Sequence, residues 1–150
     1  MIYSMNFGNG GTSVDPTGII TYLSPNSTGT NASLYNQTYT KVIDDNSINN
    51  TDPTRNKIET RHVSGTNYTD IIATCLLDYG EPSGQDALDN ATSSDSLYVF
   101  DELGLVSYAT SGTGRLLTHV IFHPVQKSLN RLIQIDYTVR VQSLTGFNEA

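Results

Sequence analysis

The sequence predicts an all-β protein, an antiparallel β-sandwich of jelly-roll or immunoglobulin-like type with an extended, loop-rich N-terminal segment. The composition is polar but weakly charged, with 37% hydrophobic and 15% charged residues, and it is rich in Thr, Asn, Ser and Gly. Such a composition favours short strands joined by many turns over a disordered chain, which usually carries a high charge. Near the C-terminus apolar and polar residues alternate strictly, as in a half-buried strand, with Ile133, Ile135, Tyr137, Val139 and Val141 on one face.

At 150 residues the chain has the size of one domain, and we divide it into residues 1–54 and residues 55–150. The first part is polar and has few apolar residues, so it can hardly build a core alone. Two interpretations stay open, a loop-rich face of the same domain or an arm ordered on a neighbouring subunit. In both, Tyr22, Tyr35 and Tyr39 are candidate assembly contacts, because tyrosine combines an apolar ring with a polar tip.

The second part is the predicted sandwich core, and it begins with a hairpin. Alternation from Arg55 to Val63 predicts a strand, and Ser-Gly-Thr-Asn at 64–67 has the chemistry of a turn. The next segment, 68–77, is apolar on both faces from Ile71 to Leu77, as expected of a strand that is covered on two sides. It contains Cys75, which cannot form an internal disulfide because it is the only cysteine, and which we place in the core.

Turns and short strands are predicted for the rest of the core. Residues 80–96 indicate a surface loop with one helical turn around 86–90, and residues 110–114 a second turn. Between them, Glu102–Leu105 is interpreted as a turn in which Gly104 supplies a bulge or a close approach of two backbones. Pro124 then ends the following strand or marks it as an edge strand.

Charge and hydropathy exclude several classes of function. The net charge of −7 and the lack of a Lys/Arg cluster argue against nucleic acid. Apolar stretches of membrane-spanning or signal-peptide length are missing, which predicts a soluble protein made in a cytoplasm. Residues 62–114 hold eight acidic and no basic residues, whereas residues 115–150 hold four basic and two acidic ones. Copies could therefore meet head to tail, or the acidic part could meet a basic partner, and the alternative is a solvated acidic face.

The segment THVIFHPV contains two histidines that could bind a metal ion. His119 and His123 are four residues apart, but on a strand this spacing separates side chains by roughly 13 Å, too far to share one metal ion. We expect both on the same interface or half-exposed face. Neither a nucleophile motif nor a phosphate loop accompanies them, so we predict no enzyme, no metal, no cofactor and no small-molecule substrate.

Three segments, LYVFDELGLVSY, RLLTHVIFHPVQKS and RLIQIDYTVRV, carry a resemblance to a family. They resemble the small β-domain found near the attachment end of tail-collar and tail-fibre proteins of tailed bacteriophages, although Val106 stands where an aromatic residue is usual. The residues that carry the resemblance are architectural: Glu102, Leu103, Gly104, Leu105, His119, Phe122, Pro124 and Lys127. The resemblance implies a non-enzymatic virion protein, assembled in the host cytoplasm in several copies in the tail, collar or neck, or fibre-attachment apparatus. Its partners would be copies of itself and other virion proteins.

Two alternative functions remain compatible with the sequence. A capsid decoration protein is favoured if the acidic middle of the chain caps a shell lattice. A carbohydrate-binding module is possible because β-sandwiches with exposed Tyr and Asn side chains can bind sugars.

Overall fold

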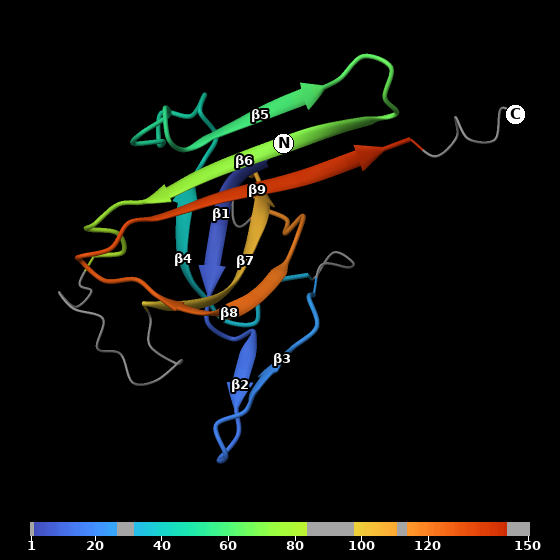
Figure 1. Cartoon of the computed structure of the whole chain (residues 1–150). Coiled ribbons are helices and arrows are strands. Elements are labelled where there is room, and N and C mark those ends of the chain that lie inside the picture. The colour runs from blue at the N-terminus through green and yellow to red at the C-terminus, as the bar shows by residue number, and fades with distance from the viewer. Residues whose placement is uncertain (1, 27–31, 84–97, 111–113, 144–150) are drawn as a thin grey trace, which may run out of the picture.

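A computed structural model describes residues 2–26, 32–83, 98–110 and 114–143, and it is all-β, as the sequence predicts (Figure 1). Among these residues there is no helix long and apolar enough to cross a bilayer. The nine strands, in chain order, are β1 (Ile2–Gly8), β2 (Thr12–Val14), β3 (Ile20–Tyr22), β4 (Gln37–Val42), β5 (Lys57–His62), β6 (Tyr68–Leu77), β7 (Val99–Ser107), β8 (Val120–Gln126) and β9 (Ile133–Gln142).

The strands form two larger sheets and one hairpin, and every pairing is antiparallel. The four-stranded sheet has the order β4-β1-β7-β8, the three-stranded sheet has the order β5-β6-β9, and β2 and β3 form the hairpin. In the four-stranded sheet β1 and β7 are central, and the chain crosses between the two sheets several times to build it. The three-stranded sheet lies across the other in Figure 1.

The hydrophobic core lies between the two larger sheets. The four-stranded sheet contributes Met5, Phe7, Phe100, Leu103 and Leu105, and the three-stranded sheet contributes Ala73, Cys75 and Leu77, all buried. Four residues of the predicted face of β9 pack against this cluster, namely Ile133, Ile135, Tyr137 and Val139, whereas Val141 is exposed. Cys75 is fully buried, which confirms its predicted place in the core. This burial raises the pKa of its thiol to about 12.

Several predicted elements are confirmed at their expected positions. The hairpin of β5 and β6 is joined by a turn in which Gly65 has a φ of 90°, a conformation that suits glycine. Pro124 does not end its strand, since β8 continues to Gln126, but it marks an edge: β8 is the last strand of its sheet. The loop around residues 86–90 and most of the turn at 110–114 lie outside the described residues.

The predicted turn at Glu102–Leu105 is wrong. These residues form the middle of β7, a nine-residue strand paired with β1 on one side and β8 on the other. The segment interrupts an apolar run with two acidic residues and a glycine, which is the pattern of a turn. Both acidic side chains are nevertheless buried in the sheet, where they accept hydrogen bonds from distant segments of the chain. What remains of the prediction is a register shift between Phe100 and Glu102, and a close backbone approach at Gly104.

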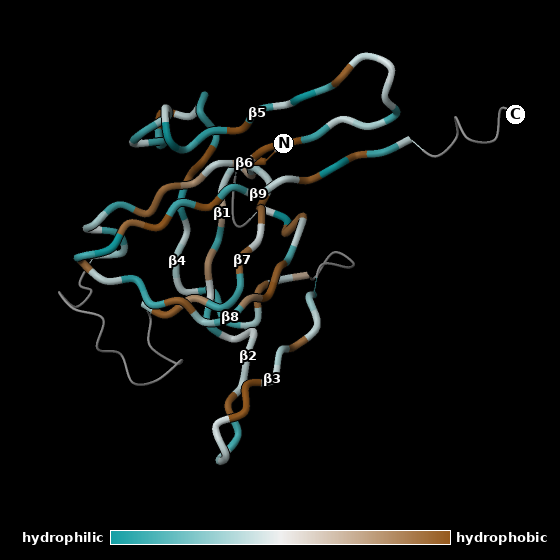
Figure 2. Tube along the Cα trace, viewed as in Figure 1, coloured by the Kyte–Doolittle hydropathy of each residue, from teal (hydrophilic) through white to brown (hydrophobic). Residues whose placement is uncertain are grey.

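The N-terminal residues take two different places in the fold. Strand β1 is inserted between β4 and β7, and Met5 and Phe7 belong to the main core. The β2–β3 hairpin instead projects from the end of the four-stranded sheet (Figure 1). Figure 2 shows hydrophobic residues along this hairpin, at a distance from the core.

Candidate functional site

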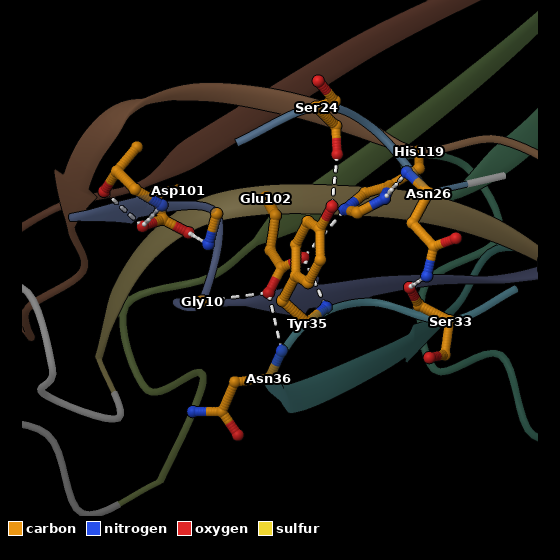
Figure 3. A network of polar contacts seen from close by, with 11 residues as sticks. Gly10, Ser24, Asn26, Ser33, Tyr35, Asn36, Asp101, Glu102 and His119 are labelled. Atoms are coloured by element: carbon orange, nitrogen blue, oxygen red, sulfur yellow. Dashed lines mark hydrogen bonds and ion pairs between the residues drawn. The ribbon is translucent and has the colours of Figure 1, made fainter. Parts of the chain in front are cut away.

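The most distinctive site is a buried polar network at the base of the projecting hairpin (Figure 3). It is built on two consecutive acidic residues of β7, Asp101 and Glu102, which are both fully buried. Side chains of successive strand residues point to opposite faces, so the two carboxylates serve different segments of the chain. Burying two charges in this way is costly unless each has strong hydrogen-bond donors.

Glu102 holds the loop that precedes β4 and the loop that follows β1. Its Oε2 accepts hydrogen bonds from the backbone nitrogens of Gly10 and Asn36, both at 2.9 Å. Its Oε1 accepts from the backbone nitrogen of Tyr35 at 2.9 Å and lies 2.8 Å from Nε2 of His119. Four donors therefore converge on one buried carboxylate and satisfy its two oxygens.

His119 connects Glu102 to the segment that returns from the hairpin. Its Nδ1 accepts a hydrogen bond from the backbone nitrogen of Asn26 at 2.7 Å, so this ring nitrogen carries no proton. Nε2 must then donate to Glu102, which makes the ring the neutral Nε2–H tautomer. The ring also lies against Tyr35, with the ring centroids 5.5 Å apart.

Asp101 anchors the base of the hairpin itself. Its two carboxylate oxygens accept hydrogen bonds from the backbone nitrogen of Gly11 at 2.9 Å and from the backbone nitrogen and hydroxyl of Thr12 at 3.0 and 2.6 Å. A further bond, from the backbone nitrogen of Leu23 to the oxygen of Gly11, closes the hairpin at 2.8 Å. The hairpin thus leaves the sandwich in one fixed direction.

A third carboxylate closes the hairpin tip. Asp15 Oδ1 accepts from the backbone nitrogen and hydroxyl of Thr17 and from the backbone nitrogen of Ile19, at 2.7–2.9 Å. These hydrogen bonds lower the pKa of Asp15, and the bond from the Thr17 hydroxyl has the largest effect. Gly18 supplies the positive φ of 89° that the turn needs. Both ends of the hairpin are therefore ordered by hydrogen bonds within the chain.

Several apolar side chains of this hairpin are exposed. Val14 is 51% exposed, Ile19 63% and Tyr22 50%. Leu23, just after β3, is exposed as well. Ordered apolar side chains on a projecting element are typical of a protein–protein contact surface.

The predicted site residues take different places relative to this network. Glu102 and His119 are brought together, Leu103, Gly104 and Leu105 pack in the strand beside them, and Phe122 covers the core. His119 and His123 were expected on the same interface or half-exposed face, and for His119 this is wrong. Its side chain is buried and hydrogen-bonded within the chain, whereas His123 is exposed. Lys127 is fully buried and donates to the backbone oxygens of Tyr79 and Ser128, and desolvation lowers its pKa.

The three tyrosines also differ. Tyr22 is on the exposed hairpin, and Tyr35 is 44% exposed beside His119, with its hydroxyl donating to the backbone oxygen of Ser24. Tyr39 points into the sandwich, where it packs against Phe7 and donates to Glu81; burial raises the pKa of its hydroxyl. Sequence reasoning missed Asp101, although an adjacent acidic pair inside an apolar run signals buried carboxylates that need donors.

The central side chains of the network are closed off from solvent. The side chains of Glu102 and His119 have no exposed surface, and both ring nitrogens of His119 are occupied by hydrogen bonds. The described residues contain no group of three or more His, Cys, Asp or Glu arranged to hold a metal ion. A cavity of about 340 Å³ between the sheets is lined mainly by core side chains such as Phe100 and Phe122. The arrangement can hold loops and a hairpin in place, which is a structural task.

Comparison with known proteins adds no relative. No family model, curated protein or solved structure matches the chain.

Proposed function

We propose that the protein is a non-enzymatic structural component of a tailed-phage virion, assembled in several copies in the tail, collar or neck, or fibre-attachment apparatus. One observation carries the proposal: a hairpin that is anchored at its base by Asp101 and closed at its tip by Asp15 presents exposed apolar side chains away from the core. Figure 1 shows how far this element stands out from the two sheets.

The physical basis is preorganisation. A free loop would lose conformational entropy when it binds, and this loss lowers affinity. The hairpin has already lost that entropy on folding, because carboxylates of the chain itself hold its backbone. Val14, Ile19 and Tyr22 can therefore contact a neighbouring virion protein at a small entropic cost.

The sequence resemblance supports the virion assignment. Its three segments correspond to β7, β8 and β9, and Glu102 and His119 from two of them form the buried pair that holds the hairpin-bearing end together. In this proposal the resembling residues provide a rigid frame, and the hairpin makes the contacts.

The proposal is tested by genetic complementation. A phage that encodes the chain is disrupted in this gene, and the protein is supplied from a plasmid. We expect the wild-type chain to restore infectious particles and to be found in purified virions in several copies. The combined variant Val14→Ser, Ile19→Ser and Tyr22→Ser should fold but not enter particles.

Val63→Ser is the matched control, because Val63 is 53% exposed but lies in the turn after β5. This variant should complement normally. Normal particles without the gene product, or purified virions that lack the chain, would contradict the proposal.

A further inference from the structure

Strand β9 has an open edge that is complementary to itself. It is the last strand of the order β5-β6-β9, and among the described residues nothing pairs with its other side. With ten residues it is as long as any strand in the fold. An edge of this length offers a row of backbone donors and acceptors to another strand.

The hydrogen bonds to β6 show which residues face the open edge. Ser143, just after β9, donates its backbone N–H to the oxygen of Asn67 beyond the start of β6. Because backbone groups of successive strand residues point to alternate sides, the odd-numbered residues of β9 face β6. The residues whose N–H and C=O groups face the open edge are Gln134, Asp136, Thr138, Arg140 and Gln142.

The side chains of these outward residues are complementary to themselves about Thr138, with glutamine at both ends, aspartate on one side and arginine on the other. If a second β9 pairs antiparallel with Thr138 opposite its own copy, Asp136 meets Arg140 of the partner subunit, and this pair occurs twice by symmetry. Gln134 then lies opposite Gln142. On the core-side face, Ile135 lies opposite Val141, whose side chain is 58% exposed in the single chain.

The same charges disfavour other registers. Centring the pair on Asp136 or on Arg140 places like charges opposite each other, which is destabilising. Centring it on residue 137 or 139 pairs neither charge with its opposite. Only the register centred on Thr138 matches both charges, so the strand specifies a single two-fold arrangement.

The existing contacts of Arg140 are compatible with this pairing. Arg140 already binds Asp70 on β6 at 2.8 Å and stacks on Tyr68, and its side chain is still 53% exposed. Within the part of the chain that the structure describes, the Asp136 carboxylate accepts one hydrogen bond, from the side-chain amide of Gln134 at 3.3 Å. In the pair each arginine would lie between Asp70 of its own chain and Asp136 of the other.

We propose that two copies of the chain join through their β9 strands in this register, which makes one continuous six-stranded sheet. The inference rests on the proposed assembly of several copies and names the surface that they share. The edge strand β5 is a weaker candidate. There Glu59 could meet Arg61 of a second copy, but β5 has six residues and Glu59 is already paired with Lys57 at 2.9 Å.

The test is a charge exchange between two variants of the full chain, followed by analytical ultracentrifugation. Asp136→Arg and Arg140→Asp should each raise the dissociation constant of the dimer by about tenfold or more, because both inter-chain pairs become repulsive. An equimolar mixture of the two variants should recover the dimer, since arginine again faces aspartate at both positions. Asp45→Arg, an exposed loop substitution with the same change of charge as Asp136→Arg, is the control and should leave association unchanged.

The register is tested separately by cross-linking. Cα atoms of a hydrogen-bonded antiparallel pair are about 5.5 Å apart, within the range of a disulfide. Thr138→Cys should therefore give an oxidised covalent dimer, whereas Gln134→Cys should not. Cys75 is fully buried and should not interfere.

A wild-type chain that stays monomeric at about 1 mM overturns the inference. Three other results would also overturn it. The dimer could persist in both charge variants, the mixture of the two variants could fail to re-form the dimer, or Glu59→Arg could dissociate the dimer while Asp136→Arg does not. Circular dichroism verifies that each variant is folded. Thr138→Pro removes a backbone N–H that faces the open edge and none that faces β6, so it should dissociate the dimer without disturbing the pairing with β6. Virion content distinguishes the two proposals, because a monomeric chain that is still found in particles contradicts only the β9 pairing, and a dimer that is absent from particles contradicts only the virion assignment.

Discussion

Glu102 and His119 lie 2.8 Å apart, and neither side chain has any exposed surface. The pair joins β7 to the residue that precedes β8, and through it the segments around Gly10, Asn26 and Tyr35 are fixed to the sheet. Each of the four donors that is removed from this buried carboxylate therefore lowers its stabilisation.

Replacing Glu102 by glutamine should destabilise the protein strongly. The new amide group would place N–H groups against backbone donors that now point to a carboxylate, and buried donors without acceptors cost about 1–3 kcal/mol each. We expect the free energy of unfolding to fall by about 3 kcal/mol in denaturant titrations. Glu59→Gln on exposed β5 is the control and should change it by less than about 0.5 kcal/mol.

The variant His119→Phe should release the segment that returns from the hairpin. Phenylalanine keeps the packing against Tyr35 but cannot accept the hydrogen bond from Asn26. We expect the amide of Asn26 to exchange with solvent much faster by NMR, while amides in β6 and β9 keep their protection. His123→Phe, on an exposed position, should leave the exchange pattern as it is. Unchanged protection at Asn26 in His119→Phe would show that the hydrogen bond contributes nothing.

The direction of the hairpin should depend on Asp101. In Asp101→Asn one of the two oxygens that bind Gly11 and Thr12 is replaced by a donor, so we expect a loss of about 1–3 kcal/mol in stability and faster amide exchange at residues 11 and 12. Asp15→Asn changes only the exposed tip and should keep the base protected. Equal loosening of the base in both variants would argue against Asp101 as the anchor.

Gly104 should not tolerate a side chain. A Cβ at this position would lie 2.4 Å from the backbone oxygen of Thr118 and 2.5 Å from Cδ1 of Leu116, and the backbone oxygen cannot move without disturbing the sheet. Gly104→Ala should therefore cost about 3 kcal/mol or more, and Gly104→Val should misfold. Gly80→Ala is the comparison, because open space surrounds that position. A wild-type melting temperature for Gly104→Ala would show that the backbones are not this close.

The interaction of Asp70 with Arg140 should make the free energy of unfolding depend on pH in the acid range. The hydrogen bonds from Arg140 lower the pKa of Asp70 below its ordinary value of 3.8. Because the folded pKa lies below the unfolded one, the stabilisation is complete above about pH 3.8 and is lost as the pH falls toward the folded pKa. Asp70→Asn should therefore be less stable than wild type near neutral pH and should approach it below pH 3.8, whereas Asp45→Asn should follow wild type throughout. Urea titrations at several pH values measure this difference.

Much of the three-stranded sheet could be predicted from the sequence. The alternation of β9, the apolar run of β6 and the turn around Gly65 are local signals, and each fixes an element without knowledge of its neighbours. For β8, Pro124 predicted either the end of the strand or an edge strand, because the proline nitrogen cannot donate a hydrogen bond to a further neighbour. The edge position is the one observed.

The four-stranded sheet and the polar network could not be predicted in this way. Acidic residues within β7 are read locally as a break, yet they lie inside the sheet because their donors come from Gly11, Thr12 and Asn36, which are 66–90 residues away in the sequence. The sequence alone determined the fold class and those strands, such as β6 and β9, whose apolar and polar residues follow a clear pattern. The tertiary structure alone decided that Glu102 and His119 are buried, because a charged side chain in a strand can be buried only where the rest of the chain brings donors to it.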